Sequence, residues 1–280
     1  MSSNLDFGKV SIIIPTVNEH YLSYIISSLK KQTKKPYELI IISKGFDPKL
    51  AEGLCSKLDF KYTVIEQRKG GFTQALNIGK SEAKGNLLIF ADDDIIAPPD
   101  WVEKYIKLHE FYGSIVACIS GREQYYDLST ATIKYSPDEK MRVQLYRKMI
   151  RPLFDRPHHL LKMYKLGVYL TNNFDISVGK NIPYKQCFSF PLRGANMSFK
   201  QDSISGLKFP EHPLLKRAPG NEQHLGLQLF LKGYQMVYSP ENPVLHIMHE
   251  SLSRPQKKIE ITNEFEIMRS LFSKLLQENK

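Results

Sequence analysis

The first 120 residues alternate short apolar runs with longer segments of helical character. Leu22, Ile25, Ile26 and Leu29 follow the i, i+3, i+4, i+7 spacing of an amphipathic helix. Further helices are predicted at 49–58, 72–83 and 101–112. Strands are predicted at 10–14, 39–42, 62–65, 87–90 and 115–119, and those at 10–14, 39–42 and 87–90 are expected to be buried because they are almost wholly apolar runs. Strands that alternate with helices predict an α/β fold built on a parallel sheet.

The second half of the chain has a less regular pattern. Residues 142–180 mix apolar and basic side chains and are helix-like in places, with interruptions at Pro152 and Pro157. A helix is predicted at 222–231, and short strands at Val237 and 244–248. A last amphipathic helix is predicted at 257–276, so the chain divides into regions 1–125, 126–250 and 251–280.

Three consecutive aspartates, Asp92 to Asp94, follow the predicted strand 87–90 directly. They therefore lie at the carboxyl end of a strand, the edge where open α/β sheets bind ligands. Clustered carboxylates repel each other unless a cation neutralises them, and Mg²⁺ or Mn²⁺ takes one or two carboxylates together with phosphate oxygens. This pattern predicts that Asp92 and Asp94 hold a metal ion bound to a diphosphate. The alternative is that the aspartates only form a turn and cap the helix that begins near Pro99.

Composition narrows the class of protein. The 280 residues are 42% hydrophobic, which is enough to bury a core, and the net charge of +10 indicates an anionic partner. Eight cations and two aspartates give residues 142–180 a net charge of +6, more than half of that total. This basic segment is predicted to contact a polyprenyl-phosphate acceptor or an anionic membrane face, or else to be an ordinary solvated surface whose apolar residues pack in the core.

Several motifs are absent. No 18-residue apolar span and no apolar signal-peptide core occur, so the expected location is the cytoplasm, with peripheral contact at the inner membrane face. Cys55, Cys118 and Cys187 lack a CxxC spacing and are interpreted as core residues. A dinucleotide cofactor is not expected, because no GxGxxG follows the first strand. A nucleic acid partner is not expected either, because the RNP, helix-turn-helix and zinc signatures are missing.

The motifs SIIIPTVNE, ALNIGKSEAKGNLLIFADDDIIAPPDW, RGANMSFK and GNEQHLGLQLFLKGY occur in an order that resembles family 2 inverting glycosyltransferases of the GT-A fold. The resemblance covers about residues 9–250. It implies a mixed, mostly parallel, Rossmann-like sheet flanked by helices, with a nucleotide-sugar-binding subdomain at 1–125 and an acceptor-binding subdomain at 126–250. By position, the nucleotide sugar would contact Pro15, Thr16, Asn18, Glu19, Ser43, Lys44, Asn77, Asp92, Asp93, Arg193, Gly194 and Asn196.

The resemblance also implies catalytic roles. Asp92 and Asp94 correspond to the metal-binding Asp-x-Asp, and His246 lies where some relatives place a histidine that joins the metal or diphosphate. His246 and His249 are three residues apart on a predicted strand, so they would face opposite sides. Glu222 stands at the position of the catalytic base and departs from the family, because Asn221-Glu222 replaces Glu-Asp. Its alternative role is that of an acid favoured by the dipole of the first helical turn.

A second departure concerns the nucleotide. Ser43, Lys44 and Gly45 replace the usual Asp-Asp-Gly-Ser after the second strand, so the carboxylate that accepts from a uracil ring N–H is missing. Lys44 would face a phosphate or be a solvated loop residue. The expected function is metal-dependent, inverting transfer of a sugar from a nucleotide-diphosphate donor to a glycan, polysaccharide or lipid-linked acceptor. The alternatives are a nucleotidyltransferase on the same scaffold, a basic nucleic-acid-binding protein, or an inactive relative.

Overall fold

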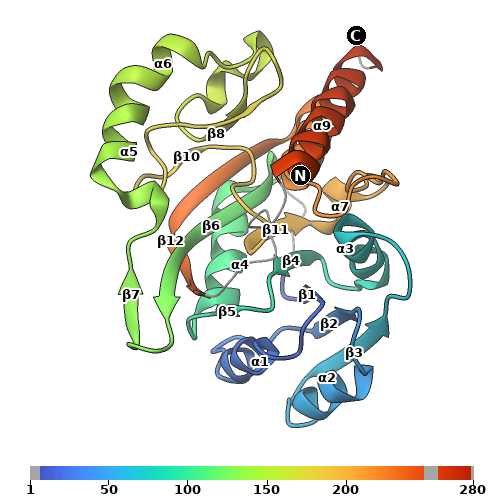
Figure 1. Cartoon of the computed structure of the whole chain (residues 1–280). Helices are drawn as coiled ribbons and strands as arrows, with labels where there is room; N and C mark the ends of the chain where they lie inside the picture. The colour runs from blue at the N-terminus through green and yellow to red at the C-terminus, as the bar shows by residue number, and fades with distance from the viewer. Residues whose placement is uncertain (1–6, 249–257, 279–280) are drawn as a thin grey trace.

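A large mixed sheet forms the centre of the molecule, with helices on both sides (Figure 1). The computed structural model describes residues 7–248 and 258–278. The strands of this sheet follow the order β10-β12-β6-β11-β4-β1-β2-β3, and β5 and β7 pair with β12 and β6. This arrangement confirms the predicted α/β class.

The amino-terminal half contributes four parallel strands to the sheet. The strands β1 (Val10–Thr16), β2 (Glu38–Ser43), β3 (Lys61–Glu66) and β4 (Leu87–Ala91) pair in parallel in the order β4-β1-β2-β3. They are connected by α1 (Leu22–Lys30), α2 (Pro48–Cys55) and α3 (Phe72–Glu82). Helix α4 (Trp101–Tyr112) has the predicted bounds. The periodicity of this half therefore predicted every one of these elements.

Alternate residues of the central strands supply two separate cores. Ile13 and Phe90 face α3, α8 (Asn221–Leu231) and α9 (Lys258–Glu278), whereas Ile12 and Ile89 face α1, α2 and α4. Successive strand residues point to opposite faces, so a strand buried on both sides is apolar at every position. This explains why β1, β2 and β4 read as continuous apolar runs.

The second half differs from the prediction in its strands. β6 is much longer than predicted (Val116–Asp127), and one strand, β12 (Gln235–Ile247), replaces the two short strands. A register shift between Ser239 and Val244 lets β12 stay paired in parallel with β6. The motif RGANMSFK, for which no element was predicted, contains β11 (Asn196–Lys200), which runs antiparallel to both β4 and β6. Polar residues inside these strands concealed them: Asn196 and Ser198 of β11 are buried polar residues that bond to neighbouring elements, so the strand does not form an apolar run.

The basic segment is mainly helical at the edge of the molecule. It contains α5 (Met141–Leu145), a π-helical turn (Tyr146–Ile150), α6 (Arg151–Phe154) and a 3₁₀ helix (His159–Tyr164). Pro152 lies in the first turn of α6, where a missing N–H is tolerated. The remaining short elements are β5 (Ile95–Ile96), β7 (Thr132–Lys134), η1 (Pro137–Glu139), β8 (Val168–Leu170), β9 (Ile176–Val178), β10 (Cys187–Phe188) and α7 (Gln201–Ile204).

Two further predictions concern single residue types and hydropathy. Cys55 and Cys118 are buried as predicted, but Cys187 is half-buried, and all three are free thiols. Across residues 7–248 and 258–278, no helix combines the length and the apolar character that crossing a bilayer requires.

Candidate active site

The acidic cluster lies at the carboxyl end of β4, next to the end of β1. Asp92 to Asp94 follow Ala91, the last residue of β4, and Thr16 ends β1. The Thr16 hydroxyl donates a hydrogen bond to the Asp93 carboxylate, which joins the two strand ends. The capping alternative is wrong, because α4 begins at Trp101, after the intervening strand β5, and none of the three aspartates is its N-cap.

His246 of β12 lies between two carboxylates. Its Nε2 is 3.1 Å from Asp94 Oδ2, and its Nδ1 is 3.2 Å from Glu123 Oε2. The pairing of β12 with both β5 and β6 sets this position, since His246 is opposite Ile95 in one strand and Tyr125 in the other. The tertiary fold thus brings a histidine 152 residues away in sequence to the aspartate loop. His249 lies outside the described residues.

Proton affinities in this cluster are strongly displaced. Burial and the neighbouring charge of Asp94 raise the pKa of Asp92 well above its usual range. Burial acts to lower the pKa of His246, but its hydrogen bonds to Asp94 and Glu123 outweigh this and raise it to about 11. Burial acts to raise the pKa of Glu123, yet the charges of Arg193 and His246 lower it overall. The cluster is therefore an excess of buried negative charge that needs cationic partners.

The donor atoms of Asp92, Asp94 and His246 fit a divalent cation. One ligand atom from each residue lies within 4.8 Å of the others. Two carboxylates and an imidazole are ligands that proteins use for divalent ions, and the repulsion that raises the pKa of Asp92 is the repulsion a cation would relieve. The structure therefore supports Asp92, Asp94 and His246 as the residues that would hold a divalent ion.

A chain of ion pairs leads away from this cluster toward α5. Arg193, just before β11, contacts Glu123 Oε2 through Nη1 at 3.5 Å and Asp138 Oδ2 through Nη2 at 2.8 Å. Asp138 also pairs with the buried Arg147 of the π-helical turn. Arg193, predicted to contact the nucleotide sugar, thus connects the acidic cluster to the helical segment.

Glu222 lies in the first turn of α8. Gly220 precedes it with φ of 91°, a left-handed conformation that glycine adopts without strain. Burial raises the pKa of Glu222 to about 7, and the charges of Glu123 and Arg193 also act on its carboxyl group. An acid with this proton affinity is suited to accept a proton near neutral pH. Its place in the helix is equally that of an acid favoured by the dipole, so both predicted roles stay open.

The residues predicted to hold the nucleotide lie mostly at the ends of β1 and β2. Pro15 and Thr16 are buried in the last two positions of β1, whereas Asn18 and Glu19 are exposed in the following loop. Ser43 is buried at the end of β2, where it pairs with Thr16. The ammonium group of Lys44 donates to the Gly70 carbonyl. Gly194 has no neighbour within 4 Å of the position a Cβ would take, so its backbone is open.

Two residues predicted to bind the nucleotide sugar, Asn196 and Asn77, instead form hydrogen bonds with other parts of the protein. Asn196 Oδ1 accepts from Trp101 Nε1 and the Tyr105 hydroxyl, and its Nδ2 donates to the carbonyls of Arg122 and Asn242. These four bonds use the full capacity of the amide, so Asn196 joins α4, β6 and β12. Asn77 likewise binds the backbone of Phe209 in both directions and donates to Glu211. The structure does not bring these two side chains to the acidic cluster.

Sequence reasoning missed Glu123 and Asp138, which connect His246, Arg193 and Arg147. The available signal was weak: Glu123 lies four residues after the apolar run of β6 ends at Ile119, in the polar stretch SGREQ, and the structure shows that it is buried. A buried glutamate without a partner is costly, so its presence there indicates a cationic partner elsewhere in the fold. Asp138 carries no comparable signal, because it lies in a polar stretch.

Comparison with known proteins agrees with this geometry. Residues 11–167 match the model of the family Glycosyl transferase family 2. Glycosyltransferase GlyA of Streptococcus pneumoniae is 32% identical over 112 residues, which are 38% of this chain and 16% of that protein. The undecaprenyl-phosphate 4-deoxy-4-formamido-L-arabinose transferase of Yersinia enterocolitica is 27% identical over 132 residues, 44% of this chain and 40% of that protein. The chain thus spans less than half the length of these two relatives.

Solved structures share the fold. GalNAc-T7, crystallised with UDP, GalNAc and Mn²⁺, superposes with a TM-score of 0.64 at 16% identity, covering 87% of this chain and 44% of that one. The mannosyltransferase PcManGT of Pyrobaculum calidifontis, in complex with GDP-Man and Mn²⁺, gives a TM-score of 0.57 at 14% identity and covers 97% of this chain and 70% of that one.

Proposed function

Since the chain belongs to glycosyl transferase family 2, we propose that it transfers a sugar, with inversion, from a nucleotide-diphosphate donor to a glycan, polysaccharide or lipid-linked acceptor. The observation that carries the proposal is the juxtaposition of Asp92, Asp94 and His246 at the carboxyl edge of the sheet. The charges of Glu123, which contacts His246, and of Arg193 act on the carboxyl group of Glu222. A diphosphate site and an acid able to accept a proton are the two elements that the reaction requires.

The donor would lie across the ends of β1, β2 and β4. Pro15, Thr16, Asn18, Glu19, Ser43 and Lys44 would border the nucleotide, and Asp93, Arg193 and Gly194 the diphosphate and sugar. Asp92 and Asp94, with His246, would hold Mg²⁺ or Mn²⁺. When bound there, the cation would supply positive charge to stabilise a departing diphosphate. Thr16 supports this arrangement, because its hydrogen bond to Asp93 fixes the aspartate loop against β1.

Glu222 would act on the acceptor. Its carboxylate takes the hydroxyl proton while the acceptor oxygen attacks the anomeric carbon, and the bond between that carbon and the diphosphate oxygen breaks on the opposite face. The nucleoside diphosphate leaves with the bonding pair, so the configuration at the anomeric carbon inverts. An acceptor phosphate is already anionic and needs no base. The loss of rate in Glu222→Gln therefore reports on the class of acceptor.

The search for donor and acceptor starts from the known structures and relatives. The two solved structures named above contain UDP in one case and GDP-Man in the other. Ser43 and Lys44 give this chain no carboxylate for a uracil N–H at that position. The relative from Yersinia enterocolitica is named for undecaprenyl phosphate, which supports including a lipid-linked acceptor in the search.

The test is a panel of nucleotide sugars assayed for release of nucleoside diphosphate, with Mg²⁺, Mn²⁺ or a chelator. We expect turnover of at least one donor with metal and none with chelator. Asp92→Asn and Asp94→Asn should each lower the rate more than about 100-fold, since even residues that only support metal ligands are worth 10- to 100-fold. Asp59→Asn, at an exposed aspartate paired with Lys35, is the matched control.

Two results would contradict the proposal. Turnover that survives chelation and both aspartate substitutions would remove the metal from the reaction. Release of pyrophosphate from a nucleoside triphosphate and a sugar phosphate would favour the nucleotidyltransferase alternative. The anomeric configuration of the product, read by NMR, decides between inversion and retention.

A further inference from the structure

The helical segment 141–154 presents apolar side chains to solvent. Leu145, Met149 and Leu153 lie at successive four-residue intervals, and the exposed fractions are 55% for Leu145, 63% for Met149 and 68% for Leu153. The exposed apolar residues of this segment are Met141, Leu145, Tyr146, Met149, Ile150, Leu153 and Phe154. Single exposed apolar residues are normal, but a contiguous set along one helical segment marks an interaction surface. The interpretation of these residues as core is therefore wrong.

Cations surround this apolar surface. Across the segment 141–165 the sole acid in the sequence is Asp155, which pairs with Arg151. In the part of the chain that the structure describes, no ion pair engages the exposed cations Arg142, Lys148, Arg156, Lys162, Lys165, Lys180 and Lys185. The unneutralised charge of the basic segment is thus concentrated around the apolar helix.

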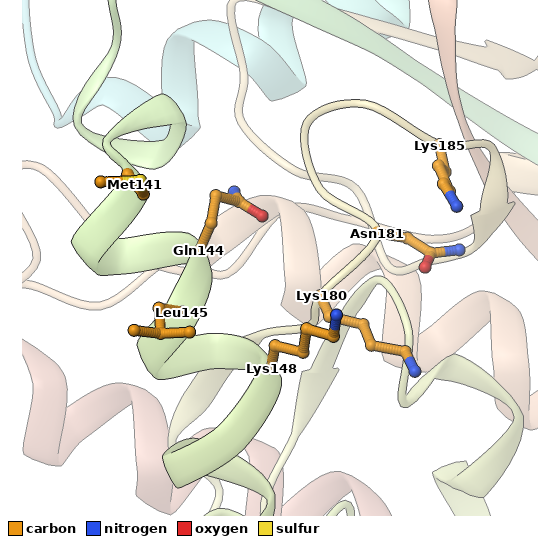
Figure 2. A pocket seen from close by; sticks show the side chains of 7 residues that line it. All are labelled: Met141, Gln144, Leu145, Lys148, Lys180, Asn181 and Lys185. Atoms are coloured by element: carbon orange, nitrogen blue, oxygen red, sulfur yellow. The ribbon is translucent and has the colours of Figure 1, made fainter.

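Two depressions lie within this basic surface. One, of about 400 Å³, has Met141, Leu145 and Lys148 of the helix on one side and Lys180 and Lys185 of the facing loop on the other (Figure 2). The second, of about 380 Å³, is bordered by Arg156, His159, Lys162 and Lys165. Each places ammonium or guanidinium groups beside apolar surface. That combination suits a phosphate headgroup whose attached chains extend over an apolar face.

We propose that residues 141–165, with Lys180 and Lys185, form a membrane-docking face that binds the surface of an anionic phospholipid bilayer. The apolar residues of 141–154 enter the boundary between headgroups and acyl chains, and the lysines contact lipid phosphates. Charge complementarity selects the bilayer over a second copy of this chain, because two copies of this face would bring their unpaired cations together. The docking requires no step of the transfer reaction, so it stands independently of the proposed function.

A chain of ion pairs links the helical segment of the docking face to the candidate active site. Arg147, on the buried side of the same helical segment, pairs with Asp138, and Asp138 pairs with Arg193 beside Glu123. A lipid-linked acceptor anchored in the bilayer would then be presented at the end of the molecule that carries Arg193. This last step rests on the proposed function.

The test is co-sedimentation of the full chain with vesicles of phosphatidylglycerol and phosphatidylethanolamine in equal amounts, against vesicles of phosphatidylcholine alone. No sugar nucleotide is present, so failure here leaves the transfer reaction untouched. We expect binding to the anionic vesicles only, weakening as salt shortens the range of the electrostatic attraction. The triple variant Lys148→Gln, Lys180→Gln, Lys185→Gln should bind roughly 100-fold more weakly, by about 1 kcal/mol per lysine at an anionic surface.

A matched control removes the same charge elsewhere. Lys49 lies in α2, and Lys31 and Lys57 follow the ends of α1 and α2; all three are exposed. These two helices are at the opposite end of the molecule from α5 and α6 (Figure 1). The triple glutamine variant of these lysines should bind at least 10-fold more tightly than the first triple variant. The apolar residues should account for the part of the vesicle binding that remains at high salt. The combined substitutions Leu145→Ser, Met149→Ser and Leu153→Ser should abolish this remaining binding. The matched set Leu50→Ser, Phe111→Ser and Ile115→Ser, also at exposed positions, should retain it.

Three outcomes would overturn the proposal. The first is no binding of the native chain to anionic vesicles at low salt. The second is equal loss of binding in both lysine triple variants, which would show that net charge alone drives adsorption. The third is that the serine substitutions at 145, 149 and 153 leave vesicle binding intact but convert an oligomer to a monomer by light scattering, which would assign the face to contact between copies of this chain.

Discussion

The acidic cluster and the docking face carry opposite charges. The charges of the cluster are buried and paired, whereas those of the docking face are exposed. In the acidic cluster, Asp94, Glu123 and Asp138 are buried or half-buried and each contacts a cation, as in the pairs Glu123–His246 and Asp138–Arg147. On residues 141–165 the cations Lys148 and Lys162 are exposed without an ion pair among the described residues. Buried charges must be paired because desolvation is expensive, whereas exposed charges cost little. The carboxylates of the first region are therefore held in place by their ion pairs, whereas the cations of the second region are available to a binding partner.

Glu222→Gln gives the largest expected effect in the active-site region. With a hydroxyl acceptor the rate should fall about 10²- to 10⁴-fold, the usual contribution of a general base. The native activity should rise with pH through about 7, where Glu222 ionises, and this pH dependence should disappear in the variant. The measurement is a pH–rate profile of both proteins with saturating donor.

The stability of the same variant separates its two roles. The folded-state pKa of Glu222 is about 7 against an ordinary value of 4.5, so the folded state binds the proton more tightly and loses stability as pH rises from 4.5 to 7. Glutamine stays neutral, so the variant should be more stable than the native chain above pH 7, by up to about 3 kcal/mol, and equal to it below pH 4.5. If Glu222 acted only as a charged acid favoured by the helix dipole, the substitution would have the reverse effect, a loss of stability near neutral pH. Urea unfolding at both pH values distinguishes the two.

Arg147 and Lys148 are adjacent cations on opposite sides of the same helical segment. Arg147→Met should lower the free energy of unfolding by about 3 kcal/mol, because it leaves the carboxylate of Asp138 with Arg193 alone in a partly buried site. Lys148→Met should change it by no more than about 0.5 kcal/mol, as expected at an exposed site. Equal losses in denaturant unfolding would contradict the division between the two regions.

Glu123→Gln weakens the support of His246 without removing a proposed ligand. The amide can still contact His246, but it removes the negative charge that helps to raise the pKa of the imidazole. We expect metal affinity or activity to fall about 10- to 100-fold, the range for groups that orient metal ligands. Calorimetric titration with Mn²⁺ measures the first quantity directly. A variant that binds Mn²⁺ as the native chain does would place Glu123 outside the metal site.

The smallest expected effect belongs to the apolar residues of the docking face. Leu153→Ser removes an apolar side chain that is already 68% exposed, so the free energy of unfolding should change by no more than about 0.5 kcal/mol. Phe90→Ser, at a fully buried position of β4, should lower the free energy of unfolding by at least about 3 kcal/mol. Thermal denaturation of the two variants measures this difference between an exposed apolar residue of the docking face and a buried residue of the core.

Sequence pattern alone determined the amino-terminal half of the molecule. In β1, β2 and β4 each side chain faces one of two cores, so both faces are apolar and the strands stand out as runs. The helix α4 was predicted to the residue, and the three aspartates were placed at the correct sheet edge because that edge follows from strand direction. Local periodicity and strand polarity are properties of neighbouring residues, which a sequence states directly.

Only the tertiary structure decided which distant residues meet at the site. His246 meets Asp94 only because β12 pairs with both β5 and β6, and Asn196 is fully bonded within the scaffold only because α4, β6 and β12 converge on it. The basic segment shows the same limit, since its composition suits either a core or a surface and only packing reveals that Leu145 and Leu153 are exposed. Contacts between residues distant in the chain depend on strand pairing and register, which no local pattern of apolar and polar positions specifies.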